Sequence, residues 1–194
     1  MPDNSQKPQK WELQESREVY ANDFIKIRQD LVKLPSGRLY DNYFVTERND
    51  WAGVICLSED RQKMLLTRQY KHGAGEIFWE LPAGGLNKGE AAETGALREL
   101  GEETGYKPAS GKLEPLGVFV VDPATSFNRC NVYFCADAVA APELKEDNDL
   151  EIIECEWVSI DSLLDRIREG REISGTHSGI ILFALLKLGI LTRR

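Results

Sequence analysis

Apolar and polar residues alternate in short runs along much of this 194-residue chain. Near the N-terminus, apolar positions recur in residues 11–19, 24–32 and 40–46. The turn signals Ala21-Asn22-Asp23 and Pro35-Ser36-Gly37 separate these three segments. The pattern predicts three short strands that form an antiparallel meander.

A second group of predicted strands covers residues 51–57 and 64–70, which are joined by a polar turn, and residues 78–81, which lead into Pro82-Ala83-Gly84-Gly85. A glycine-rich turn and a helix follow. Further strands are expected at residues 113–121, 131–135 and 152–158, and helices at 159–170 and 176–188. We expect Asp161 to cap the first of these two helices and Ser174 or Thr176 to cap the second. This order of elements favours an α/β (α+β) fold, an α/β/α sandwich on a mixed sheet with an added N-terminal β-meander.

The length suits one sizeable core, and no break in composition separates two large domains. We therefore expect a disordered lead-in at residues 1–10, the meander at 11–47 and the main domain at 48–194. The lead-in is polar and lacks the apolar segment of a secretory signal, which favours a cytoplasmic protein. The apolar stretch 179–191 is interrupted by Lys187 and is too short to span a bilayer.

The formal net charge of −8 argues against binding to nucleic acid backbones, which needs a basic surface. A small phosphorylated ligand is still compatible with this charge, because a metal and a few local cations set the field in a cleft. Four cysteines lie in apolar contexts without metal-ligand spacing, and we expect reduced core thiols: Cys56, Cys130, Cys135 and Cys155.

The segment of residues 84–106 carries the strongest chemical signal. Glu99, Glu102 and Glu103 lie three and four positions apart, so a helix places them on one face. We expect this face to leave room for a cation and an anionic ligand, because one turn earlier it carries only small residues: Ala92, Gly95 and Ala96.

Left unpaired, these carboxylates would repel one another close to the negative end of the helix dipole, just before the expected C-cap Gly105. A divalent cation would remove this penalty, and oxygen ligands without His or Cys suit Mg²⁺ or Mn²⁺. Arg98 can reach Glu102 one turn away and hold it in place. The alternative interpretation is a solvated acidic helix face.

The full spacing runs from Gly84 through Glu90 and Arg98 to the three glutamates, Gly105 and Tyr106. It resembles the Nudix box, GX5EX7REUXEEXGU, with an aromatic residue in the last U position. The resemblance implies the Nudix fold and metal-dependent hydrolysis of a nucleoside diphosphate linked to another group. It also implies that Glu99, Glu102 and Glu103 are metal ligands or water-activating groups, and that the backbone carbonyl of Ala83 is a further ligand.

Two neighbouring motifs, Glu80-Leu81-Pro82-Ala83-Gly84 and Arg68-Gln69-Tyr70-Lys71, resemble the ADP-ribose and nucleoside diphosphate sugar diphosphatase branch. The resemblance places Arg68 and Tyr70 at the substrate. The planar guanidinium of Arg68 suits a diphosphate, although a solvated arginine at the end of a strand is the alternative. Glu80 is interpreted as either a further ligand or a structural carboxylate.

In that branch, a glutamate on a loop far beyond the box often activates the water. The acidic stretch at residues 146–154 occupies the corresponding place, and Glu151 is the first candidate because its Glu-Ile-Ile-Glu context resembles the branch. Asp149 and Glu146 are alternatives, as is a merely solvated acidic loop. The proline that marks ADP-ribose hydrolases corresponds to Pro123, displaced by a short insertion, so ADP-ribose, GDP-mannose and ADP-glucose all stay open as substrates.

Family relatives stack the nucleobase on aromatic residues of the N-terminal strands, where this chain has Phe24 and Tyr40, which could equally be core residues. A meander outside the sandwich would expose an apolar face, which predicts a homodimer. His72 and His177 receive no catalytic role. Two other functions are weighed: hydrolysis of dinucleoside polyphosphates or nucleoside triphosphates, and a Nudix-like nucleotide sensor without catalysis.

Overall fold

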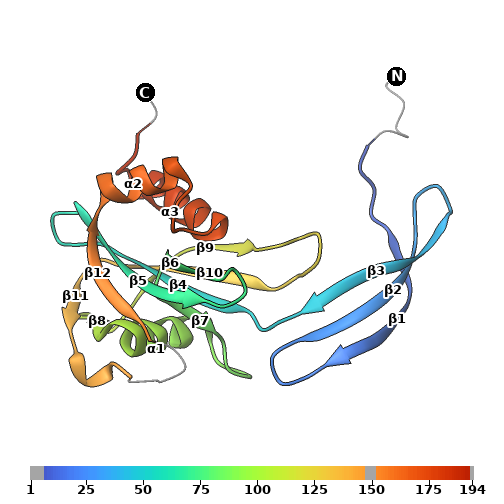
Figure 1. The fold of residues 1–194 in the computed structure, drawn as a ribbon, viewed down its shortest axis with the longest axis horizontal. Coiled ribbons are helices and arrows are strands. Elements are labelled where there is room, and N and C mark those ends of the chain that lie inside the picture. The colour runs from blue at the N-terminus through green and yellow to red at the C-terminus, as the bar shows by residue number, and fades with distance from the viewer. Residues whose placement is uncertain (1–6, 147–151, 193–194) are drawn as a thin grey trace. The chain divides into compact units, whose positions relative to one another are not determined.

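The computed structural model describes residues 7–146 and 152–192 (Figure 1). The chain forms two compact units. One contains residues 1–48 together with 120–128, and the other contains residues 49–119 and 129–194. Within the described residues, no helix is long and apolar enough to cross a membrane.

The first unit is built on the three-stranded antiparallel sheet β1-β2-β3, as the sequence predicts. Its strands are β1 (Glu12–Ala21), β2 (Lys26–Lys33) and β3 (Leu39–Glu47). The Asn22 side chain accepts hydrogen bonds from the backbone amides of Phe24 and Ile25 and so forms the first turn. Gly37 supplies the positive φ of 84° in the second turn.

Residues 120–128 join this unit by contacts with β3. The Thr46 amide donates to the carbonyl of Thr125 at 2.7 Å. The Tyr43 hydroxyl donates to the carbonyl of Ala124 at 2.6 Å. The segment that contains Pro123 is therefore held by the meander.

The second unit contains two larger sheets. In the first, with the order β7-β4-β10-β9, strand β4 (Trp51–Cys56) runs parallel to β10 (Arg129–Cys135) and antiparallel to β7 (Ala83–Gly85), and β9 (Glu114–Val120) lies beside β10. In the second, β5 (Lys63–Lys71) pairs antiparallel with β12 (Glu154–Ser159) and β6 (Glu76–Glu80). The parallel and antiparallel pairs make the predicted mixed sheet.

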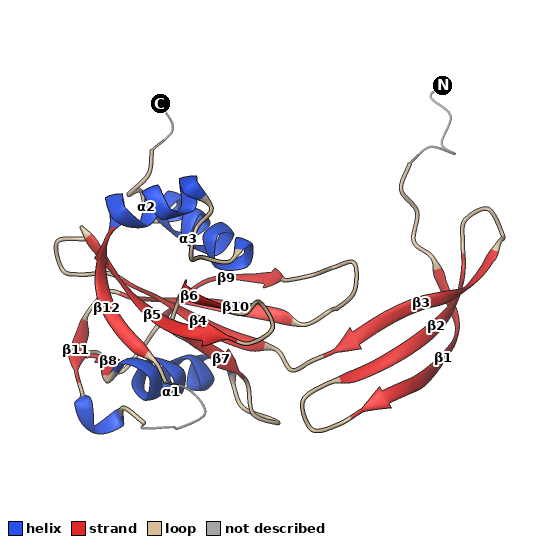
Figure 2. Ribbon diagram, in the orientation of Figure 1, coloured by secondary structure: helices blue, strands red, loops and turns tan. Residues whose placement is uncertain are grey.

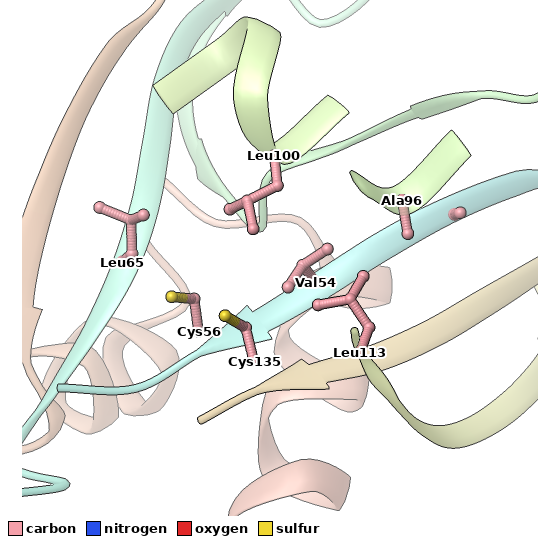
Figure 3. Packing of buried hydrophobic residues seen from close by; sticks show 8 residues of the cluster. Val54, Cys56, Leu65, Ala96, Leu100, Leu113 and Cys135 are labelled. Atoms are coloured by element: carbon pink, nitrogen blue, oxygen red, sulfur yellow. The ribbon is translucent and has the colours of Figure 1, made fainter. Parts of the chain in front are cut away.

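Helices cover both sides of these strands. Helix α1 (Ala92–Thr104) lies on one side, and α2 (Ile160–Glu169) and α3 (Gly175–Lys187) lie on the other (Figure 2). This confirms the α/β/α sandwich. Leu100 and Ala96 of α1 pack on Val54 and Cys56 of β4 in a cluster of fully buried side chains (Figure 3). The helix that carries the Nudix-like box is thereby fixed to the central strand by apolar burial.

The structure also contains elements that the sequence pattern missed. Strands β8 (Tyr106–Pro108) and β11 (Ala138–Ala140) pair antiparallel, and a short 3₁₀ helix, η2, covers Pro142–Leu144. The predicted cap of α2 is wrong, because the Ser159 side chain, and not that of Asp161, accepts the capping bond from Ser162. Ser174 caps α3 as expected. All four cysteines are free thiols, with Cys155 half-buried and the others buried.

Candidate active site

The site centres on the tight connection between β6 and β7, where Gly84 approaches α1. A Cβ atom on Gly84 would lie only 2.2 Å from Oε1 of Glu99 and 2.5 Å from Oε2. Nonbonded atoms do not approach this closely, so any side chain at position 84 would push the Glu99 carboxylate away. A larger residue could fit only if the Glu99 side chain moved, so glycine serves close approach here and not an unusual backbone angle.

Glu103 is held by the same connection. It is buried, and its Oε2 accepts a hydrogen bond of 2.9 Å from the backbone amide of Ala83. Burial raises the pKa of Glu103 to about 8, and the negative charges of Glu99 and Glu80 add to the rise. The Ala83 amide and the positive charge of Lys71 oppose it. Two box glutamates thus lie against one loop, and the surroundings of Glu103 disfavour its charge.

Arg98 links the beginning and the end of the box. Its Nε donates to Glu90 at 3.0 Å, and its Nη1 donates to Glu99 at 2.8 Å and to Glu102 at 2.9 Å. Its Nη2 donates to the carbonyl of Gly85 at 3.0 Å. The predicted contact with Glu102 is confirmed as part of a larger network, and this guanidinium lowers the pKa of Glu90 to about 2.

The oxygen groups at this loop fit a hard divalent cation. The Glu99 and Glu103 carboxylates meet the Ala83-Gly84 backbone. Burial and then the charges of Glu99 and Glu80 raise the pKa of Glu103, and a cation would offset both effects. Within residues 7–146 and 152–192, no three acidic, His or Cys side chains are already gathered as a chelate. Arg98 bonds Oε1 of Glu99 and Oε2 of Glu102, which is one oxygen of each carboxylate.

The small residues of α1 do not leave open space for a ligand, as the sequence suggested they would. A Cβ on Gly95 would lie 2.3 Å from a methyl group of Leu86 and 3.2 Å from the Glu90 carboxylate, so these side chains fill the space. Ala96 is fully buried in the core cluster. The expectation that this part of the face leaves room for a ligand is wrong. Its small side chains allow close packing of the loop before the helix and of the core.

Glu80 lies in a polar cluster beside the loop. Its Oε2 accepts from Lys71 Nζ at 2.7 Å and from Gln69 Nε2 at 3.3 Å. Its Oε1 lies 3.7 Å from Nε2 of His177. The charges of Glu80 and Lys71 act on the pKa of Glu103, so this cluster is close enough to that glutamate to affect it. The sequence interpretation left Glu80 open and gave Lys71 no role of its own.

Arg68 and Tyr70 line a common hollow of about 220 Å³. Gln69, which reaches Glu80, also lines it, as do Ile77, Ile152 and Glu154. The Arg68 guanidinium lies 3.7 Å from Glu154 and stacks over the ring of Trp79, with 5.6 Å from Cζ to the ring centroid. The structure therefore brings these two predicted substrate residues together, beside the Glu80 cluster.

The candidates for the water-activating residue are only partly described. Glu151 and Asp149 lie outside the described residues. Glu146 is exposed, and its backbone amide donates to the carbonyl of Glu102 at 3.0 Å, which ties the start of the acidic stretch to the end of the box helix.

The predicted base-stacking residues belong to the first unit. Phe24 is 88% exposed, which excludes a core role in the single chain. Tyr40 is half-buried in β3. Their part in base binding stays a prediction.

Sequence reasoning overlooked the contact made by His177. Its Nδ1 accepts a hydrogen bond of 2.9 Å from the backbone amide of Leu81, in the connection that carries Ala83. The two residues are 96 positions apart, and no spacing rule joins them. The only local signal is a histidine in the first turn of an apolar helix.

Comparison with known families gives two matches. A model described as the NUDIX domain matches residues 48–174. A model described as the nucleoside diphosphate sugar hydrolase N-terminal domain matches residues 11–46. Together they cover the meander and most of the second unit.

Similar individual proteins cover most of the chain. An ADP-ribose pyrophosphatase from Bacillus subtilis is 28% identical over 156 residues, covering 80% of this chain and 82% of the relative. A CMP-5'-(N-acetyl-N-hydroxy-3-aminopropyl)phosphonate hydrolase from Streptomyces rubellomurinus is 29% identical over 187 residues. The match covers 93% of this chain and 84% of the relative. A solved structure of an ADP compounds hydrolase matches with a TM-score of 0.73 at 16% identity, covering 96% of this chain and 100% of that one, which shows a shared fold.

Proposed function

The chain belongs to the Nudix hydrolase family, and on this basis we propose that it hydrolyses the diphosphate bond of nucleoside diphosphate sugars. The substrates are of the ADP-ribose, GDP-mannose or ADP-glucose type. The products are a nucleoside monophosphate and a sugar phosphate. Mg²⁺ is the proposed cofactor, with Mn²⁺ as a possible substitute.

One observation carries the proposal. The Ala83-Gly84 backbone lies between two box carboxylates, with Gly84 against Glu99 and the Ala83 amide bonded to Glu103. Glu99, Glu102, Glu103 and the Ala83 carbonyl are the groups that would hold the metal. A bound divalent ion neutralises phosphate charge and lowers the pKa of a coordinated water. The match of residues 11–46 to the nucleoside diphosphate sugar hydrolase N-terminal domain supports the substrate class.

The remaining residues receive roles by their chemistry and position. Arg68 and Tyr70 bind the diphosphate end of the substrate from their shared hollow, and Glu80 orients Lys71 and Gln69 next to it. Glu151 is the proposed general base, because its Glu-Ile-Ile-Glu context resembles the corresponding loop of the branch. Phe24 and Tyr40 stack the nucleobase.

A homodimer formed through the N-terminal strands is part of the proposal. Every residue of β1 is exposed in the single chain, including the apolar Leu13, Val19 and Tyr20. Exposed apolar surface on a sheet is typical of an interface. We keep the cytoplasm as the proposed compartment, supported by four cysteines that are free thiols.

The test is product analysis with a substrate panel. The purified protein is incubated with Mg²⁺ and, separately, ADP-ribose, GDP-mannose, ADP-glucose, UDP-glucose, diadenosine polyphosphates and nucleoside triphosphates. Products are separated by chromatography and assigned by ³¹P NMR. We expect a nucleoside monophosphate and a sugar phosphate from at least one nucleotide sugar, and no turnover once a chelator removes the metal.

One variant tests the box and a matched variant serves as its control. Glu103→Gln should lose turnover, whereas Glu169→Gln makes the same chemical change at an exposed position of α2 and should retain it. Turnover confined to dinucleoside polyphosphates or triphosphates would replace the proposed substrate class. No turnover of any nucleotide with Mg²⁺ or Mn²⁺ would contradict the enzymatic proposal and favour a nucleotide sensor.

A further inference from the structure

The imidazole of His177 is packed behind the loop that connects β6 to β7. It is only 8% exposed and stacks on the ring of Trp51, with 5.6 Å between centroids and 17° between planes. From this position its Nδ1 accepts the hydrogen bond of the Leu81 amide at 2.9 Å. Leu81 is buried as well, so without this acceptor its amide would lose a bond where water does not replace it.

Backbone pairing with β4 holds the end of the loop, β7, and side chains hold the amides around Pro82. Pro82 has no amide hydrogen, and its carbonyl accepts from the Val54 amide at 3.0 Å. The amides on either side of Pro82 are both held by side chains. Leu81 donates to His177, and Ala83 donates to Glu103. The connection is thus clamped between α3 on one side and the box helix α1 on the other.

The hydrogen bond from Leu81 also determines which tautomer the His177 imidazole adopts. Since Nδ1 is an acceptor, the ring proton resides on Nε2, which faces Glu80 Oε1 at 3.7 Å. The other oxygen of Glu80 is held by Lys71 and Gln69. One neutral histidine therefore contacts both the loop backbone and the carboxylate beside it.

We propose that His177 is a positioning residue for hydrolysis: as the Nε2-protonated tautomer it fixes the Leu81 amide and so holds the Ala83 peptide in place for Glu103 and the metal. This inference rests on the proposed function only in its reference to hydrolysis and metal. Within the described part of the chain, the polar partners of His177 are Leu81, Glu80 and Ser174, and none is a box glutamate. It acts through Leu81, much as groups behind metal ligands orient those ligands.

Two substitutions separate positioning from bulk packing. In His177→Asn, the amide oxygen can take the place of Nδ1 and restore the acceptor. In His177→Leu, a side chain of similar length has no acceptor. We expect His177→Leu to weaken Mn²⁺ binding to the nucleotide-free protein, followed by electron paramagnetic resonance, on the order of tenfold. We expect kcat to fall by a similar factor with KM within about twofold, and His177→Asn to recover most of both losses.

The wild-type protein provides a measurement that needs neither activity nor a variant. Nitrogen-15 NMR of the histidine side chains should show an unprotonated Nδ1 on His177, with a through-hydrogen-bond coupling to the Leu81 amide. A protonated Nδ1 or a missing coupling would overturn the proposal. Equal metal affinity and kcat in His177→Leu and the wild type would overturn it too, as would equal losses in both folded variants. If His177→Leu does not fold, the coupling between His177 and Leu81 in the wild type decides whether the proposal holds. If no nucleotide is hydrolysed but the coupling and Mn²⁺ effects hold, only the proposed function fails.

Discussion

The carboxylate of Glu99 rests against the backbone of Gly84 with no space for a side chain between them. This contact explains why a glycine begins the box fifteen positions before the glutamate that it serves. A small residue is needed at position 84 because the loop lies so close to helix α1. The neighbouring Gly85 is under no such constraint, because a Cβ there would meet nothing within 4 Å.

Gly84→Ala should therefore impair the site, whereas Gly85→Ala should be tolerated. We expect Gly84→Ala to displace Glu99, reduce apparent Mg²⁺ affinity and lower kcat by roughly 10- to 100-fold. The unfolding free energy should change by less than about 1 kcal/mol, because only the end of the Glu99 side chain has to move. Magnesium titrations of the initial rate and denaturant unfolding measure the two effects. Equal behaviour of the two alanine variants would show that the contact with Glu99 is unimportant.

The raised pKa of Glu103 predicts how the metal-free protein responds to pH. The unfolded state ionises this carboxyl near its ordinary pKa, whereas the folded state retains the proton up to about pH 8. The folded state therefore binds more protons between pH 4.5 and 8, and Glu103 lowers stability progressively as pH rises through that window. Above pH 8 the penalty is constant.

In the presence of a chelator, the wild type should consequently lose stability relative to Glu103→Gln between pH 5 and 8, on the order of a few kcal/mol. Thermal unfolding at several pH values measures the difference, with Glu169→Gln as the exposed control. Adding Mg²⁺ at pH 8 should stabilise the wild type and leave Glu103→Gln nearly unchanged. Parallel pH profiles of the wild type and Glu103→Gln would contradict the assignment.

Two roles of Arg68 can be told apart by mutation: binding of the substrate diphosphate and structural packing on Trp79. If it holds the diphosphate, Arg68→Gln should raise KM for the preferred nucleotide sugar by roughly tenfold or more, while Mg²⁺ affinity without nucleotide is unchanged. Glu154→Gln is the matched control, because it removes the ion-pair partner of Arg68 and leaves the guanidinium in place. A loss of thermal stability with unchanged KM would instead assign Arg68 to its packing on Trp79.

The three acidic candidates for the general base can be compared directly. We expect Glu151→Gln to lower kcat by about 10²- to 10⁴-fold with little change in KM, because general base catalysis contributes to the chemical step. Asp149→Asn and Glu146→Gln should stay within a few-fold of the wild type. Steady-state kinetics at saturating Mg²⁺ makes the comparison. Full activity of Glu151→Gln would remove it as the base.

The exposed apolar residues of β1 allow a test of the proposed homodimer. Leu13 and Val19 are 58% and 45% exposed in the single chain. If a second copy covers them, Leu13→Asp together with Val19→Asp should convert a dimer to a monomer with unchanged circular dichroism. Sedimentation of both proteins at micromolar concentration is the measurement. A wild type that sediments as a monomer would refute the dimer at once.

Local sequence signals predicted the regular elements and the helix of the box well. The meander, the strands β4 and β5, and helices α1 to α3 were all expected near their observed positions, because apolar periodicity and turn residues are local properties. The pairing of Arg98 with Glu102 follows from one helical turn in the same way.

Features that depend on contacts between distant segments were missed. Gly95 is small because Leu86 and Glu90 pack on it, and helical spacing alone does not reveal that neighbour. Strands β8 and β11 are only three residues long each, so neither shows a periodic pattern. His177 reaches Leu81 only because α3 packs beside the loop, and nothing near position 177 identifies that partner.

The dependence of Leu81 on His177 has a consequence for biosynthesis. The box helix and its loop are made well before α3, which lies near the C-terminal end of the chain. During synthesis, the residue that completes the backbone support of the loop emerges 96 residues after Leu81. A nascent chain therefore acquires the carboxylates first, and the loop gains its full backbone support only after α3 has been made and has docked.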